Sequence, residues 1–62
     1  MNPVTKAIIE TIGDSGFSIT IGDGVVEAVS ERTGELFVVT GDDLYATAVE
    51  LAEQVGIELV EG

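Results

Sequence analysis

The sequence contains no cysteine, histidine or tryptophan, and only two of its 62 residues, Lys6 and Arg32, are basic. Without cysteine there are no disulfide bonds, and without cysteine or histidine the usual zinc sites cannot form. The imidazole and thiol groups on which most acid–base and nucleophilic catalysis depends are also missing. We therefore expect a protein that is not an enzyme, that binds no cofactor or metal and that resides in the cytoplasm.

Long apolar runs are missing as well. No run approaches the roughly 18 residues of a membrane span, and the Met1–Pro3 segment lacks the positive charge that begins a signal peptide. Hydrophobic residues make up 45% of the chain, which suits a globular core. The length predicts one domain, residues 1–62, and a chain this short buries only about 60% of its unfolded surface.

Negative charge is abundant. Twelve Asp and Glu residues give a net charge of −10, whereas a small domain needs a net charge of only about 2–8 to stay soluble. Nucleic acids and anionic membranes attract positive charge, so the sequence predicts direct binding to neither. A basic protein partner is the natural complement, and acidity that serves only solubility is the alternative.

A hairpin over Val25–Thr40 is the predicted centre of the fold, because two β-rich runs flank the loop Arg32–Gly34. The preceding run, Phe17–Ile21, alternates apolar and polar residues as a half-buried strand does. Asp23-Gly24 between these runs predicts a two-residue type I′ turn. That turn pairs Ile21 with Val26 and Ile19 with Ala28.

At the second hairpin we expect a turn over Glu31–Gly34 that pairs Glu31 with Glu35 and Ala28 with Val38. A helix would then pack on the face that contains Ile19, Ala28 and Val38. The opposite face would carry an apolar patch of Val29, Phe37 and Val39. That patch indicates either tolerated surface residues or an interaction surface.

Two helices flank the predicted strands. Asn2 is the expected N-cap of a helix from about Pro3 to Ile12 that ends at Gly13. Its apolar stripe is Val4, Ala7, Ile8 and Ile12. The second helix begins near Thr40–Asp43, with Thr40 and Asp43 as a capping box or Asp42 as the N-cap, and ends at Gly56. Its core stripe is Leu44, Ala48, Leu51 and Val55.

The predicted fold is therefore α+β: a helix, a three-stranded antiparallel β-meander and a helix. Residues 57–62 are predicted to form either a short C-terminal strand, which their alternating apolar residues indicate, or an ordered tail. Three Gly–Asp clusters lack the ligand spacing of a calcium loop, and turn and cap chemistry accounts for them.

The acidic residues of the second helix form the candidate partner-binding stripe. On a helical wheel Asp42, Asp43, Glu50 and Glu53 lie opposite the core stripe, and no Lys or Arg offsets them at i+4. Glu27, Glu31 and Glu35 are expected to extend this negative surface from the hairpin. We expect that reversing the four helix charges weakens partner binding and leaves the fold intact.

The order of elements resembles the topology of double-stranded RNA-binding domains, but Lys6 and Arg32 are too few cations for that function. In size, charge and acidic stripe, the chain resembles the small phage-encoded anti-CRISPR proteins that mimic DNA. This resemblance implies a protein in the bacterial host cell that binds a basic nucleic-acid-binding protein, a CRISPR-Cas complex above all, and blocks DNA recognition. We expect a monomer rather than a homodimer.

A second resemblance points to another class of protein. The Gly41-Asp42 step and Leu44, followed by Ala48 and Ala52, resemble the strand-to-helix step of HicB-like antitoxin domains. That resemblance implies an antitoxin-like or assembly domain that dimerises or binds a partner through its strand face.

Overall fold

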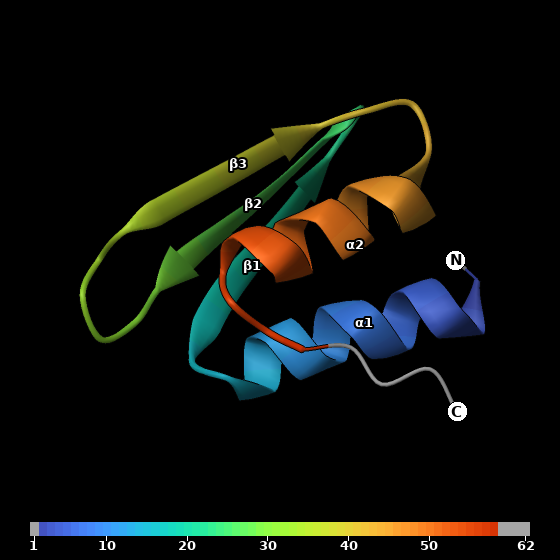
Figure 1. Cartoon of the computed structure of the whole chain (residues 1–62). Helices are drawn as coiled ribbons and strands as arrows, with labels where there is room; N and C mark the ends of the chain where they lie inside the picture. Colours follow the sequence, from blue (N-terminus) through green and yellow to red (C-terminus); the bar gives the residue numbers. More distant parts are fainter. Residues whose placement is uncertain (1, 59–62) are drawn as a thin grey trace.

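A computed structural model of the chain describes residues 2–58. The elements are α1 (Pro3–Asp14), β1 (Phe17–Gly22), β2 (Val25–Ser30), β3 (Leu36–Thr40) and α2 (Leu44–Gln54). The strands form one antiparallel sheet in the order β1-β2-β3, and both helices cover the same face of it (Figure 1). The predicted α+β order of helix, meander and helix is confirmed. Of the predicted C-terminal strand, residues 57 and 58 have no regular structure, and 59–62 lie outside the described residues.

The first helix begins where the sequence predicts and ends later. The Asn2 side chain accepts a hydrogen bond from the Val4 N–H at 2.8 Å, as an N-cap does. At the other end Gly16, with φ +95°, takes the left-handed conformation predicted for Gly13. The helix runs past Gly13 because the Ser15 N–H and the Gly16 N–H close the last turn on carbonyls one turn earlier.

The buried side of α1 also differs from the predicted stripe. Thr5, Ile8 and Ile12 are buried, whereas Val4 is 56% exposed and Ala7 is exposed. The apolar residues of this helix cover more than the single side that a two-layer fold buries. The periodicity therefore identified the helix without fixing which of its apolar residues face the core.

The first hairpin has the predicted register, with Ile21 opposite Val26 and Ile19 opposite Ala28. The turn type differs from the prediction. Gly24 has φ +73°, but Asp23 does not have positive φ, so this is not a type I′ turn. The left-handed region would cost a non-glycine residue such as Asp23 about 1–2 kcal/mol, so Asp23 does not adopt it. The length of the loop, two residues, is enough to set the register.

The second hairpin is one residue out of the predicted register. Ser30 rather than Glu31 closes the loop, with its N–H donating to the Glu35 carbonyl at 2.9 Å. Ala28 therefore pairs with Phe37, and Val26 pairs with Val39. A one-residue shift exchanges the two faces of a strand. Phe37 and Val39 consequently face the helices, and Leu36 and Val38 face outward.

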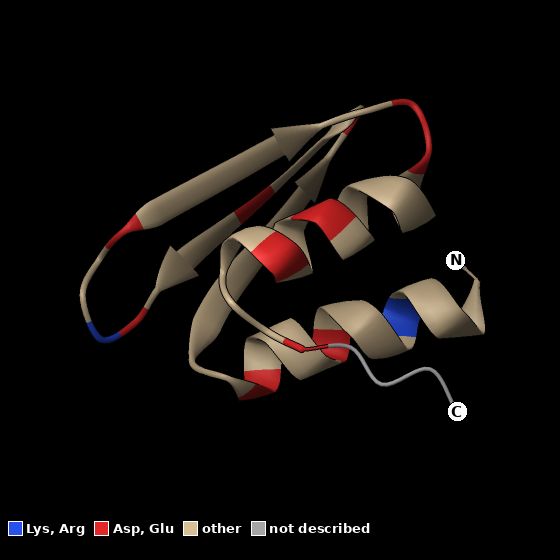
Figure 2. Ribbon diagram, viewed as in Figure 1, with Lys and Arg blue, Asp and Glu red and all other residues tan. Residues whose placement is uncertain are grey.

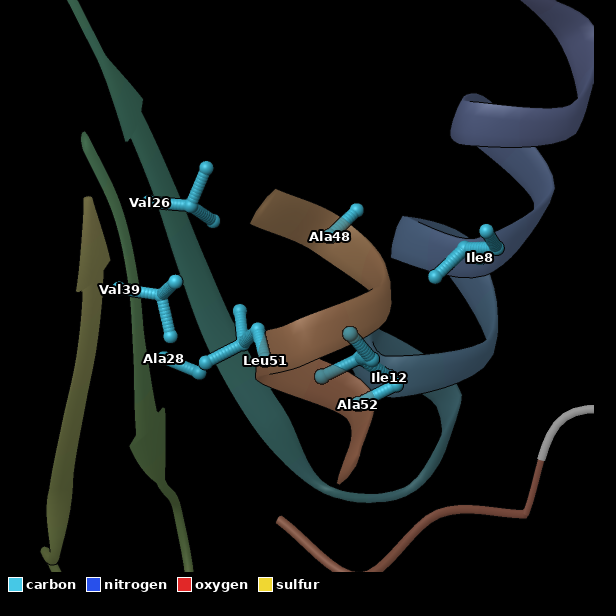
Figure 3. Close-up of a cluster of buried hydrophobic side chains, with 8 residues drawn as sticks. All are labelled: Ile8, Ile12, Val26, Ala28, Val39, Ala48, Leu51 and Ala52. Carbon is cyan, nitrogen blue, oxygen red and sulfur yellow. The ribbon is translucent and has the colours of Figure 1, made fainter. Parts of the chain in front are cut away.

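The core lies between the sheet and the two helices, as Figure 3 shows. Leu51 of α2 is fully buried, and Ala28, Ala48 and Ala52 are fully buried beside it. These alanines bring the α2 backbone close to β2 and α1. The edge-to-face pair of Phe17 and Phe37, with ring centroids 6.0 Å apart, packs against this core.

The second helix ends as predicted. Gly56, with φ +81°, is its left-handed residue. The Ile57 N–H donates to the Ala52 carbonyl at 2.9 Å, and the Gly56 N–H donates to the Glu53 carbonyl at 3.2 Å. These two bonds form a Schellman motif. The predicted core stripe is confirmed: Ala48 and Leu51 are buried, and Leu44 and Val55 pack partly buried against the core.

Candidate functional site

The acidic residues at and before α2 occupy two different settings. Asp42 and Asp43 precede the helix, so a helical wheel does not describe where their side chains lie. Asp43 is the N-cap: its backbone is extended, and its side chain accepts a hydrogen bond from the Tyr45 N–H at 3.2 Å. Glu50 and Glu53 lie within the helix, and both are exposed. We call these four carboxylates the α2 row.

The segment that carries Asp42 and Asp43 is fixed to α2 by Thr47. The buried Thr47 hydroxyl donates to the Asp43 carbonyl at 2.8 Å. A Cβ added to Gly41 would lie 2.6 Å from the same hydroxyl oxygen, so only glycine fits this close approach. The predicted capping box with Thr40 does not form, because Thr40 is still part of β3. The backbone at the start of the row is therefore held in place by the fold.

The spacing of the α2 row can be compared with that of DNA phosphates. Asp43 and Glu53 are ten residues apart, so a rise of about 1.5 Å per residue separates them by about 15 Å along the helix. One strand of duplex DNA carries a phosphate every 3.4 Å or so, hence about four over this length. The α2 row places three carboxylates along these roughly 15 Å, with Asp42 just before them, so its linear charge density is somewhat below that of one DNA strand.

The hairpin carboxylates do not join the α2 row on one surface. Val26 and Ala28 face the helices, so Glu27 between them lies on the opposite, open face of the sheet. Glu31 and Glu35 lie in the β2–β3 loop, where Glu31 accepts a hydrogen bond from the Ser18 hydroxyl at 3.1 Å. The single negative surface expected from the sequence is therefore divided between the helical layer and the hairpin.

The structure adds two carboxylates that the sequence reading left out. Glu10 and Asp14 are exposed on α1, which packs against α2, and Figure 2 shows acidic positions on both helices. Their signal in the sequence was their i, i+4 spacing on the first helix. The helical layer therefore carries Glu10 and Asp14 on α1 in addition to the α2 row.

Very little positive charge offsets these carboxylates. Within residues 2–58 the only ion pair is Lys6 with Glu10, whose nitrogen and oxygen are 4.0 Å apart. Both side chains are mostly exposed, and an exposed i, i+4 pair contributes only about 0.3–0.5 kcal/mol. Most of the negative charge is consequently available to an external partner.

A cavity of about 210 Å³ lies between the Asp23-Gly24 turn and the Gly41-Asp42 segment. Ligand pockets usually measure about 300–1,000 Å³, so this one is small for a metabolite. No three Asp or Glu side chains in the described part of the chain gather closely enough to hold a metal ion. No helix among residues 2–58 is long and apolar enough to cross a bilayer.

The fold and its surface define a small acidic α+β domain in which one of the carboxylates in residues 2–58 forms an ion pair. Comparison of the chain with known protein families, curated proteins and solved structures gives no match.

Proposed function

We propose that this protein is a non-enzymatic inhibitor that binds the DNA-recognition surface of a basic protein in place of DNA. The most concrete candidate is an anti-CRISPR protein that blocks DNA recognition by a CRISPR-Cas complex in the cytoplasm of a bacterial host. The observation that carries the proposal is the α2 row, with four carboxylates in succession and no cation paired to it within the described residues.

The physical mechanism is replacement of phosphates by carboxylates. A groove that binds DNA holds Lys and Arg side chains at phosphate spacing, and its affinity falls steeply as salt is added. Carboxylates at a similar spacing would pair with the same cations and exclude the duplex. Because such complexes are electrostatic, association is fast and strongly dependent on ionic strength.

The proposal is tested with two variants that each remove four negative charges. Asp42→Asn, Asp43→Asn, Glu50→Gln and Glu53→Gln together neutralise the α2 row. The matched control neutralises four exposed carboxylates elsewhere: Asp23→Asn, Glu31→Gln, Glu35→Gln and Glu58→Gln. Neutral amides are used because asparagine keeps the N-cap at Asp43, whereas charge reversal there would remove the cap at a cost of about 1 kcal/mol.

Each protein is mixed with a panel of purified CRISPR-Cas surveillance complexes, and binding of the target duplex is followed by gel mobility shift. We expect one complex to lose DNA binding with the wild type and with the control variant, and to keep it with the α2-row variant. Circular dichroism confirms that both variants are folded. If no complex in the panel is inhibited, or if the two folded variants inhibit equally well, the α2 row is not a DNA mimic.

A further inference from the structure

The outer edge of β3 presents free hydrogen-bonding groups. The Ser30 N–H donates to the Glu35 carbonyl and the Gly41 N–H donates to the Gly24 carbonyl, so the odd-numbered residues of this strand bond to β2. Bonding alternates along an antiparallel pair. Leu36, Val38 and Thr40 therefore direct their backbone N–H and C=O groups away from β2. No hydrogen bond from another described residue outside the sheet reaches these groups.

The side chains at this edge are apolar and exposed on the open face of the sheet. Leu36 is 57% exposed and Val38 is 44% exposed, and Val29, directly opposite Leu36, is 37% exposed. Natural proteins protect exposed edges with lysine, proline or a β-bulge. None of these devices occurs in β3, whose sequence is Leu-Phe-Val-Val-Thr.

Carboxylates surround this edge. Glu27 lies opposite Val38 on the open face, Glu35 precedes β3, and Asp42 follows it. A second copy added antiparallel to β3 would bring Glu35 near the second copy's Asp42 at both ends, which like-charge repulsion opposes. An extended segment with lysine or arginine near its ends would meet attraction at the same positions. The charge therefore favours a basic partner over a second copy.

We propose that the β3 edge binds an extended, basic segment of a partner protein as a fourth strand of the sheet. Backbone hydrogen bonds to Leu36, Val38 and Thr40 would supply affinity, and the apolar patch with its surrounding carboxylates would select the sequence. This site replaces the strand-face patch expected from the sequence, because Phe37 and Val39 face the helices. It does not depend on the proposed function, since Asp42 is the only carboxylate that this edge shares with the α2 row.

The probe is a capped seven-residue peptide of alternating lysine and valine, titrated into the isotope-labelled full chain and followed by NMR. We expect the amide signals of Leu36, Val38 and Thr40 to shift and their hydrogen exchange to slow. The same peptide with proline at its centre, and a peptide of alternating glutamate and valine, should bind at least about tenfold more weakly. Shifts confined to α2, no saturable binding, or dimers that form through β3 in sedimentation would each overturn the proposal.

Substitutions at the edge separate backbone bonding from charge. Val38→Pro removes an outward N–H and should weaken peptide binding about tenfold, whereas Val38→Thr keeps the N–H and should bind nearly as the wild type does. Leu36→Lys and Leu36→Glu lose the same apolar contact at an exposed position, so they test charge even if Val38→Pro does not fold. We expect the lysine variant to bind the lysine peptide several-fold more weakly than the glutamate variant. Equal binding by these two would overturn the role of charge.

Discussion

Asp43 caps the N-terminus of α2, a structural role that its neighbour Asp42 lacks. Alanine substitutions at the two positions remove the same charge, so they separate the effect of the cap from the effect of charge. The Asp43 carboxylate accepts the Tyr45 N–H at 3.2 Å and lies at the positive end of α2. Loss of an N-cap costs about 1 kcal/mol, out of a total of roughly 3–9 kcal/mol for a chain of this length. For so small a domain this lowers the melting temperature by about 4–8 °C. We therefore expect Asp43→Ala to melt several degrees below the wild type.

The controls remove the same charge and leave the cap. Asp42→Ala removes one carboxylate without a cap bond and should melt at or slightly above the wild-type temperature, because repulsion falls. Asp43→Asn should melt close to the wild type, since asparagine caps as well as aspartate does. Thermal unfolding is followed by circular dichroism at one fixed salt concentration. Equal melting temperatures for the two alanine variants would refute the assignment and show that Asp42 can serve as the N-cap.

Two further predictions concern the sheet register and the net charge. Val38→Lys should leave the free energy of unfolding within about 0.5 kcal/mol of the wild type, whereas Val39→Lys should lower it by several kcal/mol, because Val39 is buried against α2. Urea unfolding measures both, and the reverse order would support the register predicted from the sequence. Raising sodium chloride from 10 to 150 mM should raise the melting temperature, because the Debye length falls from about 30 to 8 Å while the molecule extends 29 × 28 × 16 Å. A flat melting temperature would show that the carboxylates are too dispersed to destabilise the fold.

The sequence predicted the order of elements well, because most boundaries have a local chemical signal. Asn2 and Pro3 begin a helix, Gly56 ends one, and Asp23-Gly24 joins two strands with the right pairing. The second hairpin lacks such a signal. Leu36–Val39 is a run of four apolar residues with no alternation. The pattern therefore could not decide whether the even-numbered or the odd-numbered residues of this run face the core. The turn assumed over Glu31–Gly34 led to the wrong choice.

The candidate site was harder to predict, because it depends on which face of a helix or strand carries each carboxylate and not only on which residues form that helix or strand. Glu50 and Glu53 are exposed as expected, since the helix stripe fixes the side of α2 that packs. Glu27 was assigned to the same negative surface, although its neighbours Val26 and Ala28 face the helices and place it on the open face. That separation requires knowledge that both helices cover one face of the sheet, which no local pattern contains.

The negative charge of this protein can protect the exposed edge of β3 from pairing with a second copy. An apolar edge such as β3 invites pairing with any other exposed strand, including that of a second copy. Glu27, Glu35 and Asp42 around this edge make pairing between copies unfavourable, because each copy also carries a net charge of −10. The same charges attract a basic segment, so repulsion excludes one partner while attraction selects the other. We therefore expect that neutralising Glu27 and Glu35 increases self-association before it affects the stability of the fold.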